Sequence, residues 1–150
     1  MQEEHVKDVV EFINSLLKSS DLQLKASAEL VGDDYRVQVR GNDVALLLGH
    51  NAELLDALEY LGNRLLARLA GEETKIIFDS NNYRAQREKE LQLMAEKAAE
   101  RVRASRIPFS FDPMTPNERR IIHLALANDT SVKTESHGNG ENRKVTVYPA

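Results

Sequence analysis

Cysteine and tryptophan are absent from this chain of 150 residues, and aromatic residues make up only 5% of it. The lack of cysteine excludes a disulfide framework and thiol catalysis, and it fits a reducing cytosol. We therefore expect a cytoplasmic protein whose stability comes from a hydrophobic core, for which a hydrophobic content of 41% is sufficient.

Long apolar runs are also missing from the sequence. No run approaches the roughly 18 residues that a membrane-spanning helix needs. The first residues, MQEEHVKDVVEF, are acidic and amphipathic, unlike a signal or transit peptide. The sequence therefore predicts no membrane segment.

The negative charge is concentrated in the first half of the chain. Residues 1–82 hold 15 acidic and 8 basic residues, a net charge of −7, although the whole chain carries only −4. Residues 83–106 hold 7 basic and 4 acidic residues. Because an acidic surface repels polyanions, we expect any nucleic-acid function to lie in the second half.

The hydrophobic pattern of the first 80 residues switches between helical and strand-like periods. Helical spacing covers residues 4–17 and 53–70, with a single helical turn at 44–48. Strand-like runs cover residues 22–30, 35–40 and 75–78. This order of helix, strand, strand, helix, helix, strand predicts an α+β domain over residues 1–80 with one layer of three strands.

The second half begins with a long, highly charged helical segment at residues 83–105. Its apolar stripe is narrow, so we expect it to pack weakly and to link two domains over residues 81–106. A short strand at 109–111, a helix that begins near Thr115 and two strands at 132–135 and 143–148 follow. They predict a small α/β domain with a three-stranded sheet over residues 107–150.

The start of the helix near Thr115 carries strong capping signals. Thr115 is suited to the N-cap position and Pro116 to the first helical position, where its missing N–H costs nothing. Glu118 at the third helical position completes the pattern of a capping box.

The exposed side of the same helix has the chemistry of a phosphate site. At 100° per residue the aliphatic residues gather on one side, and Arg119, Arg120 and His123 gather on the other. Guanidinium groups hydrogen-bond phosphate oxygens in pairs, and imidazole can donate to phosphate or stack on an unpaired base.

Three separated segments resemble the bacterial Jag (KhpB-like) proteins. They are NYRAQRE from Asn82, DPMTPNERRIIH from Asp112, and RKVTV from Arg143. That family pairs a type II KH-like domain, of order α-β-β-α-α-β, with a small domain named for an arginine and a histidine with three residues between them. The resemblance covers nearly the whole chain from about residue 4.

The resemblance implies a protein that binds single-stranded nucleic acid, RNA in the cell and also single-stranded DNA as a candidate. It implies a role in post-transcriptional control and in envelope or division physiology. It also implies a partner, a small protein with a single KH domain. We further consider a homodimer formed through the KH-like half.

The loop of the KH-like half departs from the family's pattern. A KH loop has the form Gly-x-x-Gly with basic middle residues, because two glycines let the chain approach phosphates closely. Here it is Gly49-His50-Asn51-Ala52, in which Ala52 adds a methyl group and the middle residues supply no fixed charge. We expect a weak nucleic-acid site or, as the alternative, a simple turn between helices.

The expected main site centres on Arg119 and His123. The basic residues on adjacent elements that extend it are Arg120, Lys133, Arg143 and Lys144. Strand alternation separates Arg143 from Lys144, so only one of them should share the exposed side of the helix. The structural alternative is an ion pair for Arg119 and a position at the boundary of the core for His123.

No motif supports catalysis or a cofactor. The four histidines (His5, His50, His123 and His137) lack metal-ligand spacing, no Walker-type loop is present, and no nucleophile stands beside a base. We expect no catalytic residue, metal or cofactor. The sequence favours a non-enzymatic, cytoplasmic RNA-binding module, with a protein-interaction or dimerisation scaffold with residual RNA binding as the alternative.

Overall fold

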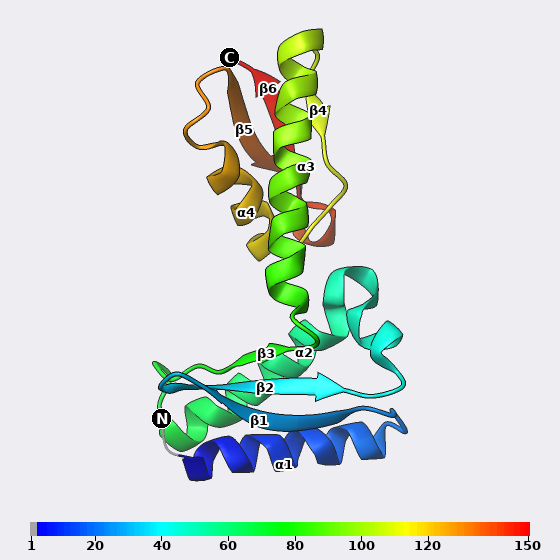
Figure 1. Ribbon diagram of the computed structural model, residues 1–150, viewed down its shortest axis with the longest axis vertical. Helices are drawn as coiled ribbons and strands as arrows, with labels where there is room; N and C mark the ends of the chain where they lie inside the picture. The colour runs from blue at the N-terminus through cyan, green and yellow to red at the C-terminus, as the bar shows by residue number, and fades with distance from the viewer. Residues whose placement is uncertain (1–2) are drawn as a thin grey trace. The chain divides into compact units, whose positions relative to one another are not determined.

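The structure is a computed structural model that describes residues 3–150. Contacts divide the chain into two compact units, Met1–Tyr83 and Arg84–Ala150. Each unit contains a three-stranded sheet and its own hydrophobic core (Figure 1). The α+β fold expected from the sequence is confirmed, whereas the domain boundaries at 1–80, 81–106 and 107–150 stay a prediction. Within residues 3–150, no helix combines the length and the apolar character needed to cross a membrane.

The first unit has the expected order of elements. They are α1 (Glu3–Ser19), β1 (Lys25–Val31), β2 (Asp34–Arg40), α2 (Val44–Ala70) and β3 (Ile77–Asp79). Helix α2 is interrupted at residues 49–52, so the order is α-β-β-α-α-β. The sheet order is β1-β2-β3, in which β1 and β2 are antiparallel and β2 and β3 are parallel. Figure 1 shows α1 lying along this sheet.

The core of the first unit lies between its helices and one face of the sheet. Four side chains of α1 (Val6, Val9, Ile13 and Leu17) are buried there with Leu55, Leu58 and Leu66 of α2. Phe78 of β3 is fully buried beside Gly62 of α2, where an added Cβ would lie only 2.7 Å from Phe78 Cζ. The glycine therefore makes room for the ring against the helix.

Two strands begin later than the sequence predicts because local hydrogen bonds compete with the sheet. The backbone N–H of Leu22 donates to the carbonyl of Leu17 (3.0 Å), which closes the last turn of α1 and delays β1 to Lys25. The side-chain amide of Asn63 pairs with both the N–H (2.8 Å) and the carbonyl (2.9 Å) of Ile76, so β3 begins at Ile77.

The second unit is built from three helical and three extended elements. They are α3 (Tyr83–Ser105), β4 (Phe109–Ser110), α4 (Pro116–Leu126), β5 (Val132–His137), the short helix η1 (Gly140–Asn142) and β6 (Lys144–Pro149). The sheet order is β4-β6-β5, and both pairings are antiparallel. Figure 1 shows α3 and α4 over the same sheet.

Helix α3 takes part in the core of the second unit, although its narrow stripe predicted weak packing. Leu91, Ala95 and Val102 are fully buried in one cluster with Ile122 of α4 and Val147 of β6. The alanines on this stripe allow the helix backbone to approach closely, so a narrow stripe is enough to bury it.

Candidate nucleic-acid interface

The N-terminus of α4 is fixed by a cap and by an ion pair with α3. Thr115 is the N-cap, its side-chain oxygen accepts from the N–H of Glu118 (3.3 Å), and Pro116 opens the helix. The carboxylate of Glu118 does not complete the predicted capping box. Its Oε1 accepts from Nε of Arg87 (2.9 Å) and its Oε2 has no partner among the described residues. This buried pair ties α4 to α3 and sets where the exposed side of α4 lies.

Arg119 is half-buried at the start of this exposed side. Its Nη1 donates to the carbonyl of Met114 (2.6 Å), and the N–H of Met114 donates to the carbonyl of Arg143 (3.3 Å). Within residues 3–150 no ion pair holds the Arg119 guanidinium, so the predicted structural alternative for this residue is not what the structure shows. The guanidinium is positioned by a carbonyl and keeps its positive charge available for a ligand.

His123 lies one turn further along α4 and bonds two hydroxyl groups of β5. Its Nδ1 is 2.7 Å from Oγ1 of Thr134 and its Nε2 is 2.6 Å from Oγ of Ser136. Burial lowers the pKa of His123 below the usual value, and the Arg119 guanidinium lowers it further. The ring is therefore neutral at pH 7 in the free protein, with one nitrogen donating and the other accepting.

Arg143 converges on the same strand from the loop before β6. Its Nη1 donates to the carbonyl of Gly138 (2.9 Å) and its Nη2 to the carbonyl of Ser136 (3.5 Å). Because His123 bonds the hydroxyl of that same Ser136, the two side chains meet at the end of β5. We call Arg119, His123, Ser136 and Arg143 the Arg119–His123 cluster.

The other predicted site residues lie outside this cluster. Arg120 is exposed on α4. Lys133 pairs with Tyr148 in the register of β5 and β6, and Lys144 pairs with His137. Side chains alternate along a strand, so these two pairs lie on the face of the sheet opposite Thr134 and Ser136. We call it the open face. Of the two basic residues at the start of β6, only Arg143 approaches the side of α4.

Sequence reasoning missed the hydroxyl residues of β5 and β6. Thr134 and Ser136 position His123, and on the open face Oγ1 of Thr146 contacts Nε2 of His137 and Oγ of Ser110 (2.8 Å). The signal was present as threonine and serine at alternate positions of residues 132–137. Its meaning depends on the register, which the sequence does not specify.

The KH-like loop of the first unit has an unusual backbone. Gly49 is extended (φ −66°, ψ 159°), whereas His50, Asn51 and Ala52 all have φ between 53° and 60°. His50 and Asn51 are exposed, but Ala52 is only 1% exposed and belongs to the core. The methyl group expected to obstruct close approach is therefore buried away from solvent.

We predict that removal of the Arg119 charge raises the pKa of His123 without restoring its usual value. Burial is the larger cause of the lowered pKa and remains in an Arg119→Gln variant, while the repulsion between the two cations is lost. NMR titration of the imidazole signals measures this shift, with His123→Gln used to assign the signal. Arg120→Gln is the matched control, and an equal rise in that variant would contradict the local explanation.

The chain is similar to known proteins over most of its length. Residues 89–149 match the family model of the Arg-x3-His domain, which is named for an arginine and a histidine with three residues between them. The chain is 31% identical to RNA-binding protein KhpB of Clostridium symbiosum over 140 residues, which are 92% of this chain and 63% of that protein. It is 34% identical to RNA-binding protein KhpB of Bacillus subtilis over 130 residues, 85% of this chain and 61% of that protein. The chain thus spans about three fifths of the length of these two relatives.

Proposed function

Because the chain belongs to the KhpB family and carries an Arg-x3-His domain at residues 89–149, we propose that it binds single-stranded RNA. The Arg119–His123 cluster is the proposed main contact surface. The observation that supports this assignment is the convergence of two guanidinium groups, an imidazole and a serine hydroxyl at the end of β5. Such a group can bind phosphate oxygens and the 2′-hydroxyl, which distinguishes RNA from DNA.

The chemistry of the cluster favours binding rather than catalysis. Both ring nitrogens of His123 contact hydroxyl groups, and both arginines are positioned by backbone carbonyls. These side chains are donors held in place for a ligand. We therefore propose a non-enzymatic, cytoplasmic regulator of transcripts, linked to envelope or division physiology, and RNA should remain uncleaved during incubation with magnesium or manganese.

The KH-like loop is the proposed weaker contact. Its exposed side is formed by His50 and Asn51, and the buried methyl of Ala52 leaves the backbone accessible. Residues 1–82 nevertheless carry a net charge of −7, which opposes binding of a polyanion. The loop therefore adds contact to RNA held elsewhere more readily than it captures RNA alone.

Binding of a labelled, unstructured RNA such as oligouridine tests the proposed function. We expect affinity to fall steeply as salt is raised, with a slope of about −0.7 in log–log form for each phosphate contacted. A duplex RNA of equal length is the control and should bind more weakly. Absence of binding to the single strand at low salt would overturn the proposal.

The open face provides a second prediction about the same binding reaction. Lys133→Ala/Lys144→Ala is expected to change RNA affinity by less than about threefold, because both lysines lie across the sheet from the cluster. Arg143→Ala is expected to weaken binding by about tenfold. Anisotropy titrations under one salt condition compare them. A larger loss from the lysine pair would move the main site to the open face.

A second candidate function is protein interaction through the first unit. Helix α2 exposes three apolar side chains (Leu46, Tyr60 and Leu61), and apolar exposure of this kind is typical of interaction surfaces. A small single-KH-domain protein and a second copy of this chain are the proposed partners. Light scattering of the whole chain at rising concentration distinguishes them, since only self-association raises the mass without an added protein.

A further inference from the structure

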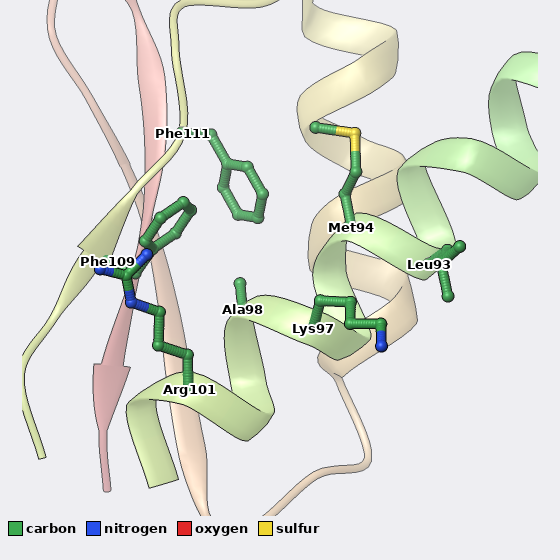
Figure 2. Close-up of a pocket in the computed structure, with 7 residues that line it drawn as sticks. All are labelled: Leu93, Met94, Lys97, Ala98, Arg101, Phe109 and Phe111. Carbon is green, nitrogen blue, oxygen red and sulfur yellow. The ribbon is translucent and has the colours of Figure 1, made fainter. Parts of the chain in front are cut away.

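A pocket of about 360 Å³ lies between α3 and β4, within the second unit. Figure 2 shows the side chains of α3 on one side of it and the rings of Phe109 and Phe111 on the other. It does not include any residue of the Arg119–His123 cluster. RNA bound at the cluster therefore does not account for this pocket.

The walls of the pocket are apolar and its rim is cationic. The apolar lining consists of Leu93, Met94, Ala98, Phe109 and Phe111, and the remaining lining residues are Lys97 and Arg101. No acidic side chain lines the pocket. An occupant that matches this lining carries a large apolar group and negative charge beside it.

Aromatic packing holds the far wall in place. The rings of Phe109 and Phe111 meet edge to face, with centroids 5.1 Å apart and planes at 85°. The guanidinium of Arg101 lies 5.3 Å from the centroid of Phe109, so this cation is stacked on the wall (Figure 2). The small side chain of Ala98, which Figure 2 shows below the ring of Phe111, leaves the floor hollow.

The near wall exposes more apolar surface than a charged helix needs for its own packing. Leu93 is 55% exposed and Met94 is 39% exposed, while the buried stripe of α3 is formed by other residues. Exposed apolar groups with a polar rim are typical of protein interaction sites, and methionine adapts its shape to different partners.

We infer that this pocket is a docking site for a protein segment that presents a large apolar side chain flanked by carboxylates. The apolar side chain would fill the hollow over Ala98, and the carboxylates would pair with Lys97 and Arg101. A nucleobase fits less well, because its polar edges would lose water without gaining hydrogen bonds from Leu93, Met94 and the two phenylalanines. The site is independent of the proposed RNA-binding cluster.

A random peptide library displayed on phage, selected on the whole chain, tests this inference. We expect the enriched peptides to combine a large aliphatic or aromatic residue with acidic neighbours. Binding should weaken by about tenfold or more in Ala98→Leu, which fills the hollow, and in Lys97→Glu/Arg101→Glu, which reverses the rim. The second variant changes only exposed side chains, so it remains informative if Ala98→Leu does not fold. Lys89→Glu/Arg120→Glu is the matched charge reversal outside the pocket and should retain binding.

The outcomes separate this site from the proposed function. An Arg119→Ala/His123→Ala variant should bind the selected peptides normally whether or not RNA binding is lost. Failure to enrich any peptide, enrichment without acidic residues, or equal binding to the wild type and both pocket variants would overturn the inference. Displacement of the selected peptides by oligouridine would also overturn it, because RNA would then be the occupant.

Discussion

Replacing both Arg119 and His123 by alanine is expected to weaken binding of single-stranded RNA by about tenfold or more. Arg119 loses charge-assisted hydrogen bonds to phosphate, each worth about 1.5–3 kcal/mol, and His123 loses a donor at the same end of β5. The slope of log affinity against log salt should become less steep by about 0.7, the value for one phosphate contact on a single strand. Anisotropy titrations at several salt concentrations measure both quantities.

The control for this variant lies on the same helix with the same spacing. Arg120 and Leu124 are both exposed on α4, so Arg120→Ala/Leu124→Ala removes the same charge without touching the cluster. Comparable NMR spectra of the two double variants would show that the fold is retained. Equal RNA affinity for both would contradict the assignment of the cluster, whatever the absolute affinity.

Replacing Phe78 by alanine is expected to destabilise the first unit by about 3–5 kcal/mol. The ring is fully buried between β3 and α2, and its space against Gly62 cannot be refilled by a small residue. Urea denaturation followed by circular dichroism measures the loss. NMR signals of residues 84–150 should persist under conditions where those of the first unit disappear.

The neighbouring residue supplies the control for this stability measurement. Ile77 lies in the same strand but is 47% exposed, so Ile77→Ala should cost about 0.5 kcal/mol or less. A similar loss in both variants would indicate that β3 contributes through its backbone rather than through the buried ring. Simultaneous unfolding of both units in Phe78→Ala would show that they do not fold independently.

The order of elements is predictable from the sequence because the hydrophobic periods are clear. The helix predicted over residues 83–105 has the bounds that the structure shows. Boundaries shift where a side chain or turn takes over the backbone hydrogen bonds, as Asn63 does at Ile76. Such competition depends on tertiary contacts, and periodicity carries no information about it.

The candidate site is predictable in part for a related reason. The placement of Arg119 and His123 on one helical face follows from a spacing of four residues. The separation of Lys133 from the cluster follows only from the pairing of Lys133 with Tyr148. The pairing of Arg87 with Glu118 joins residues 31 positions apart, and it replaces half of a capping box that local sequence favours.

The buried methyl of Ala52 has a consequence for interpreting the KH-like loop. A left-handed conformation costs a residue other than glycine about 1–2 kcal/mol, and burial of one methyl group returns about 1 kcal/mol. The two effects oppose each other at this residue, so alanine and glycine are nearly equivalent there in folding free energy. Residue 52 is thus a neutral position, and the absence of the second glycine is no sign that the loop has lost its shape.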